Sequence, residues 1–126
     1  MKCTQSPTSD STSEMFEESS MAEVDLKAIL RDSDSARFRN VMAYVIQKPA
    51  LHPDQWKVDY VYCGEINAKN GLGGYAGWER FLVEPTIDKT AAYIDDPGFS
   101  DDPSWTKTFQ FFWASFCTGQ GTPLSW

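Results

Sequence analysis

The sequence predicts an α+β domain in which three or four antiparallel strands carry an N-terminal helix and an aromatic-rich C-terminal helix on one face of the sheet. Three observations lead to this expectation. Apolar residues recur at helical spacing in residues 21–31, large apolar residues occupy every second position from Trp56 to Tyr62, and aromatic residues return to helical spacing in residues 105–116. The chain has 126 residues, which is the size of one domain. We expect residues 1–20 to be a disordered tether and residues 21–126 to form that single domain.

The expected tether is a polar segment that leads into a short helix. Nine of the seventeen residues from Thr4 to Ser20 are Ser or Thr, so the segment has little apolar surface to bury against the entropy of ordering it. Ser20 and Glu23 then have the spacing of a capping box. The apolar residues that follow lie on one helix face, at positions i, i+4, i+7 and i+8: Ala22, Leu26, Ile29 and Leu30. These signals predict a helix over residues 21–31.

The centre of the chain has the alternation and the β-forming residues that are typical of strands. Residues 41–47 and 56–63 are expected to pair as a hairpin. Four glycines lie between residues 71 and 77, and they predict a turn before a third strand over residues 75–83. Residues 90–94 would add a short fourth strand.

The last predicted element is a helix that Asp102 and Pro103 open and Gly119 closes. One face of this helix carries five aromatic residues at helical spacing: Trp105, Phe109, Phe112, Trp113 and Phe116. Such a stripe is far more often core than binding site, so we expect it to pack against the sheet.

The charge and composition exclude some classes of partner and of chemistry. Eighteen acidic and eleven basic residues give a net charge of −7, which disfavours nucleic acid as a partner because its phosphates would be repelled. The single histidine, His52, lies in a proline-flanked segment without a nucleophile motif. We therefore expect no catalytic residues, no metal and no cofactor.

Three cysteines suggest two separate roles. Cys3 opens the polar tether, which is typical of the mature start of a bacterial lipoprotein that carries its lipid on this sulfur. Alternatively, Cys3 belongs to a flexible tail that happens to contain a cysteine. Cys63 and Cys117 remain as an even pair, and in an oxidising periplasm such a pair predicts one disulfide. That bond would join the last helix to the central strand.

The run of residues 95–102 is expected to be a solvated acidic loop. It lacks the alternating register of a calcium loop, so we do not expect it to bind a metal. It could instead serve as a docking surface for a basic partner. The carboxylates concerned are Asp95, Asp96, Asp101 and Asp102.

Two segments have an unusual composition. Residues 32–41 read DSDSARFRNV, and residues 63–81 read CGEINAKNGLGGYAGWERF. Together they resemble a family of small, largely uncharacterised bacterial envelope proteins and lipoproteins. The pattern of that family runs Asp-Pro-Asp-Ser-Ala-x-Phe-Arg-Asn, then Cys-Gly-Glu-(Val/Ile)-Asn-Ala-Lys-Asn, then Gly-Gly-Tyr-x-Gly. The resemblance covers residues 32–81, under half of the chain, and departs from the pattern at Ser33, where proline is usual. It implies a compact α+β domain and supplies no established activity.

The second of these segments has a structural and a functional interpretation. Polar residues and glycines of this kind are typical of a tight hairpin turn, which is the structural interpretation. In the functional interpretation five residues form a recognition surface, because aromatic and arginine side chains dominate binding hot spots. These residues are Lys69, Asn70, Tyr75, Trp78 and Arg80.

The sequence is compatible with two functions. The first, which we expect, is a non-enzymatic periplasmic binding protein anchored through Cys3. It would be an immunity protein or inhibitor that neutralises an envelope-acting bacterial toxin or cell-wall hydrolase, and its acidic charge would speed encounter with a basic target. The second is a small envelope module or enzyme that binds peptidoglycan or another glycan through the loop from Asn67 to Arg80.

Overall fold

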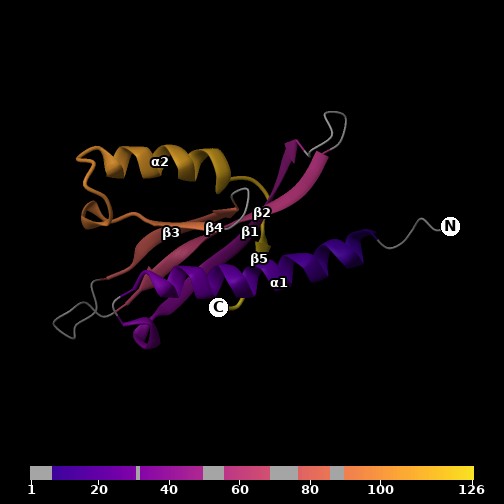
Figure 1. Ribbon diagram of the computed structural model, residues 1–126, viewed down its shortest axis with the longest axis horizontal. Helices are drawn as coiled ribbons and strands as arrows, with labels where there is room; N and C mark the ends of the chain where they lie inside the picture. The colour runs from indigo at the N-terminus through magenta and orange to yellow at the C-terminus, as the bar shows by residue number, and fades with distance from the viewer. Residues whose placement is uncertain (1–6, 31, 50–55, 69–76, 86–89) are drawn as a thin grey trace.

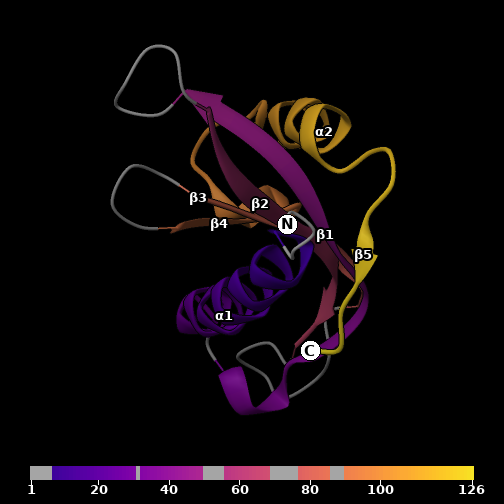
Figure 2. The same ribbon diagram turned by 90° about the vertical axis from the view of Figure 1, so that its right-hand side faces the viewer.

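A five-stranded antiparallel sheet lies between two α-helices, so that the fold has three layers (Figures 1 and 2). The computed structural model describes residues 7–30, 32–49, 56–68, 77–85 and 90–126. Within these residues the α+β class and the antiparallel sheet are confirmed. In this part of the chain, no helix has the length and apolar character needed to cross a membrane.

The sheet has the strand order β4-β3-β2-β1-β5. The expected hairpin is present: β1 (Arg37–Pro49) pairs with β2 (Trp56–Asn67). Next come β3 (Glu79–Pro85) and β4 (Thr90–Ile94), which has the predicted bounds. The expectation of three or four strands is wrong in number, because the short β5 (Thr122–Pro123) pairs with the outer side of β1. Two residues that include a proline carry no alternation signal, which explains why the sequence did not reveal this strand.

Helix α1 spans Pro7–Ala28 and begins well before the predicted start at residue 21. Residues 7–20, which we expected to be part of a disordered tether, are therefore helical here. Proline is well suited to a first helical position because its φ is preset. The buried face explains the longer helix, since it repeats at i, i+4, i+7 and i+11 through Met15, Ser19, Ala22 and Leu26. A serine in this stripe, inside a Ser-rich segment, concealed the periodicity.

Helix α2 (Trp105–Phe116) carries the predicted aromatic face into the core, although Ser104, not Asp102, is its N-cap residue. We had expected the two helices to share one face of the sheet, and this expectation is wrong: they cover opposite faces. Tyr60 and Tyr62 of β2 pack with α1, whereas Val61 and Cys63 pack with α2. All four are buried, so β2 is apolar on both sides and each face needs a covering helix.

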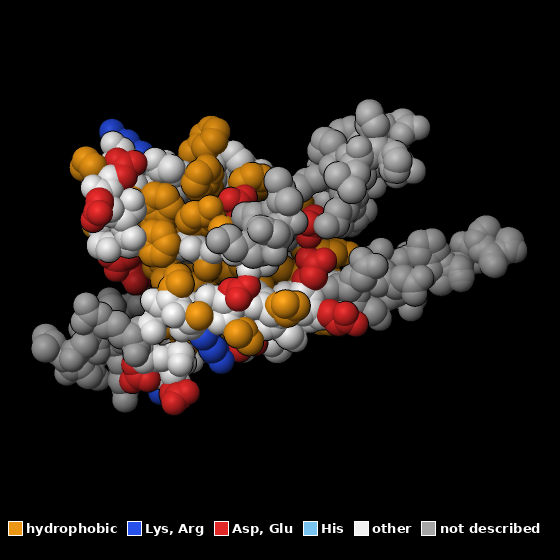
Figure 3. Space-filling view, in the orientation of Figure 1, with side chains coloured by type: hydrophobic (Ala, Val, Ile, Leu, Met, Phe, Trp, Pro, Cys, Tyr) orange, Lys and Arg blue, Asp and Glu red, His pale blue; other side chains and the backbone are white. Residues whose placement is uncertain are grey.

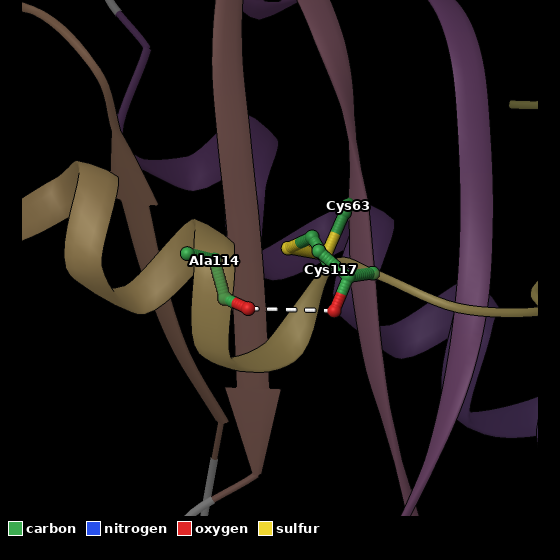
Figure 4. The surroundings of a disulfide bond; sticks show 4 residues. Cys63, Ala114 and Cys117 are labelled. Atoms are coloured by element: carbon green, nitrogen blue, oxygen red, sulfur yellow. Dashed lines mark hydrogen bonds between the residues drawn. A yellow bond between two sulfur atoms is a disulfide. The ribbon is translucent and has the colours of Figure 1, made fainter.

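A disulfide joins Cys63 of β2, the middle strand, to Cys117 at the C-terminal end of α2 (Figure 4). Their Cα atoms are 5.9 Å apart, within the usual range for this bond. The predicted pairing is confirmed, and it attaches α2 to the centre of the sheet.

Candidate functional site

Four charged side chains of alternating sign form a row across the face of the sheet that α2 covers. Arg39 of β1 lies opposite Glu65 of β2, and Glu65 lies opposite Arg80 of β3. Arg80 in turn reaches Asp95, the residue that follows β4. We call Arg39, Glu65, Arg80 and Asp95 the charged row. It runs across β1, β2 and β3 to the residue after β4, and opposite charges are neighbours at every step, which stabilises the pairing of these strands.

A bulge in β1 shapes the first half of the charged row. The register between β1 and β2 shifts between Arg39 and Met42, and Asn40 has a φ of 55°. Asparagine tolerates this left-handed conformation better than most residues. The Asn40 Nδ2 donates to Glu65 Oε1 at 2.9 Å, and Arg39 Nε donates to the same oxygen at 2.9 Å. These hydrogen bonds, with that from Arg39 the larger cause, lower the pKa of Glu65 from its usual value.

Trp78 lies over Arg39 and is exposed over 37% of its surface. The guanidinium carbon of Arg39 lies 4.1 Å from the centre of the Trp78 ring, a stacked cation–π contact. Beside it, the Gly77 amide donates to Asn67 Oδ1 at 3.2 Å. This hydrogen bond joins the end of β2 to the residues that precede β3. The exposed indole of Trp78 is therefore restrained in its orientation.

Arg80, a predicted recognition residue, has partners within the protein. Its Nη2 lies 2.8 Å from Asp95 Oδ2. Its guanidinium also faces two aromatic rings of α2, with distances of 5.4 Å to the centre of Phe109 and 5.0 Å to that of Trp113. Arg80 thus connects the sheet to α2, and its ion pair with Asp95 connects β3 to the end of β4.

Asp96 and Glu79 form a carboxyl pair next to the charged row. Burial and a hydrogen bond with Asp96 raise the pKa of Glu79 to about 8. The same hydrogen bond, together with that from the Gly98 amide at 2.7 Å, lowers the pKa of Asp96. Near neutral pH, protonated Glu79 donates to ionised Asp96, so the pair shares one proton. The hydrogen bond from the Gly98 amide also makes Asp96 the N-cap of the 3₁₀ turn η3 (Pro97–Phe99).

The other predicted residues are divided between the surface and the undescribed segments. Asp101 and Asp102 are exposed, and the Asp102 Oδ1 accepts a hydrogen bond from the Ser104 amide at 2.9 Å ahead of α2. Cys3, Lys69, Asn70 and Tyr75 lie outside the described residues. Trp78, Arg80, Asp95 and Asp96, which came from two separate sequence candidates, are brought together.

Sequence reasoning missed four polar residues of this site, namely Arg39, Asn40, Glu65 and Glu79. A signal was present for the first three, because Arg39 and Asn40 belong to the Phe-Arg-Asn block and Glu65 to the Cys-Gly-Glu block quoted above. The contacts show that these blocks pair with each other across β1 and β2. Glu79 carried no such signal, since its importance depends on the position of Asp96.

The described residues contain no candidate metal centre. No group of three or more His, Cys, Asp or Glu side chains is suitably placed among the described residues. Comparison with known proteins gave no match to a family model, a curated protein or a solved structure.

Proposed function

We propose that this protein is a non-enzymatic binding protein of the bacterial periplasm, anchored as a lipoprotein, that acts as an immunity protein or inhibitor. Its target would be an envelope-acting toxin or a cell-wall hydrolase. The observation that carries the proposal is the pairing of exposed Trp78 with Arg39 at 4.1 Å. Tryptophan is a frequent hot-spot residue, and an anchor that is already oriented loses less entropy when it binds.

Two further features support the location and the type of partner. The Cys63–Cys117 disulfide is of the kind that persists in oxidising compartments. The net charge of −7 favours encounter with a basic protein. Lipid attachment at Cys3 is tested separately, by labelling cells with a fatty acid and comparing the full chain with Cys3→Ala.

The binding proposal is tested by recovering the partner from a periplasmic extract and then measuring its affinity with purified components. Trp78→Ala should weaken binding by ~2 kcal/mol or more, which is about 30-fold. Val24→Ala is the matched control, because Val24 is 66% exposed on α1, on the opposite face of the sheet. The glycan-binding alternative replaces this proposal if no protein is recovered and if purified peptidoglycan binds the wild type but binds the Trp78→Ala variant more weakly.

A further inference from the structure

Four aromatic side chains form a continuous surface beside β4, one of the two edge strands of the sheet. The ring centres of Phe99 and Tyr93 are 6.3 Å apart. Tyr93 lies 5.8 Å from Phe112, and Phe112 lies 6.2 Å from Phe111. We call these four residues the Phe111 surface. It is built from β4, η3 and α2, so segments of three different elements contribute to one apolar area.

The Phe111 surface is open to solvent. Phe111 is 69% exposed and Phe99 is 36% exposed, while β4 is an edge strand. Figure 3 shows apolar side chains gathered over α2 and the region below it, with carboxylates at the end nearest η3. A connected aromatic surface of this kind marks an interaction site more strongly than apolar residues that are exposed singly.

The exposed apolar residues of α1 do not form a comparable surface. Phe16, Met21 and Val24 of α1 are exposed, and so is Ile29, which follows the helix. At 100° per residue, however, Phe16 lies about 80° from Val24 and about 140° from Met21, so these three residues do not form one narrow stripe. The Phe111 surface differs from these residues because its four aromatic rings contact one another in sequence.

The charges around the Phe111 surface have mostly one sign. Asp101 and Asp102 are exposed between η3 and α2, and the Tyr93 hydroxyl donates to Glu84 Oε1 at 3.2 Å. The single charged residue within α2 is Lys107. An apolar centre with a mainly acidic border complements an apolar contact segment that is flanked by Lys or Arg.

We propose that the Phe111 surface is the docking site for a basic protein partner. An apolar segment of this partner packs on Phe111 and Phe112, while its flanking cations pair with the carboxylates at the border. This inference rests on the proposed function and specifies both the contact surface and the charge of the partner. Trp78 would then be a second contact on the same partner.

Site-specific photocrosslinking in periplasmic extract tests this surface, using p-benzoylphenylalanine as the photoreactive probe. The probe is placed in the full chain at position 111, at position 78 on the charged-row side, or at position 24 on α1. A protein captured from position 111 is then identified, purified and titrated with wild type and with Phe111→Ala. The exposure of Phe111 means that this substitution should leave the fold intact, and circular dichroism verifies it.

The proposal expects position 111 to capture a protein with an isoelectric point above ~8, and Phe111→Ala to weaken its binding at least tenfold. Val45→Ala, at an exposed apolar residue of β1, should leave the affinity unchanged. Asp101→Asn with Asp102→Asn should weaken binding at low salt and have less effect at high salt. Crosslinks from position 78 alone, an acidic partner, or a second copy of this chain at position 111 would overturn the inference and leave the proposed function standing. Absence of crosslinks from every position would overturn both.

Discussion

The indole of Trp126 donates its Nε1 hydrogen to the hydroxyl of Ser19 at 2.6 Å. This bond joins residues 107 positions apart in the chain, and Ser19 is buried in the face of α1 that packs on the sheet. The same indole contacts the rings of Phe38, Tyr62 and Phe81, with centres 5.5 to 6.0 Å away. Trp126 therefore completes the core beneath α1.

Trp126→Ala should destabilise the fold by ~2 to 4 kcal/mol. It removes a large ring from the core and leaves the buried Ser19 hydroxyl without this partner. Urea unfolding followed by circular dichroism measures the loss. Trp78→Ala provides a control that removes the same side chain from an exposed position and should cost less than ~1 kcal/mol. Equal losses for the two variants would contradict the packing described here.

The sequence indicated those elements whose periodicity is strong and local. The aromatic stripe of α2 is regular along the whole helix, so burial of one side accounts for it, whereas β2 is buried on both sides. Assigning the helices to faces was harder, because residues 60–63 are apolar without interruption. Such a run identifies a strand that is covered on both sides only if the second covering element is already known.

The candidate site was predictable in part, for physical reasons that differ between residues. Trp78 and the acidic run were visible as residue types. The partnership of Arg80 with Asp95 depends on the β3–β4 register, which no local pattern specifies. The bulge at Asn40, which directs its side chain to Glu65, likewise follows from pairing between distant strands.

Removal of the disulfide should lower stability by about 4 kcal/mol, because the bond closes a loop of 54 positions in the unfolded chain. The test compares Cys63→Ala with Cys117→Ala in denaturant titrations. Cys3→Ala is the control that removes a cysteine outside the pair, and it should leave the unfolding midpoint unchanged. A reductant should lower the wild-type midpoint to a similar extent and have no effect on either of the two variants that lack the bond.

Gly64→Ala should destabilise the sheet by ~1 to 3 kcal/mol through overpacking. A Cβ at this position would lie 2.9 Å from Phe81 Cε2 and 3.0 Å from Val41 Cα. Phe81 is fully buried and the Val41 atom belongs to the backbone, so neither can move aside easily. Gly98→Ala is the matched control, because its Cβ would meet only the Asp96 side chain, at 3.3 Å. A Gly64→Ala protein as stable as this control would show that β1 and β3 can separate at little cost.

The Glu79–Asp96 pair should make stability fall as the pH rises from about 5 to 9. The pKa of Glu79 is raised from 4.5 to about 8 in the folded protein, so the native state retains a proton that the unfolded chain has already released. Its contribution is complete below pH ~4.5 and is lost as the pH passes through about 8. Asp96, whose pKa is lowered, acts in the opposite direction only at more acidic pH.

Glu79→Gln keeps a neutral donor toward Asp96 and should flatten the pH dependence of stability, with a higher urea midpoint than wild type at pH 9 and a similar one at pH 5. Asp101→Asn removes an exposed carboxylate from the neighbouring segment and should retain the wild-type slope. Parallel curves of urea midpoint against pH for wild type and Glu79→Gln would contradict the raised pKa of Glu79.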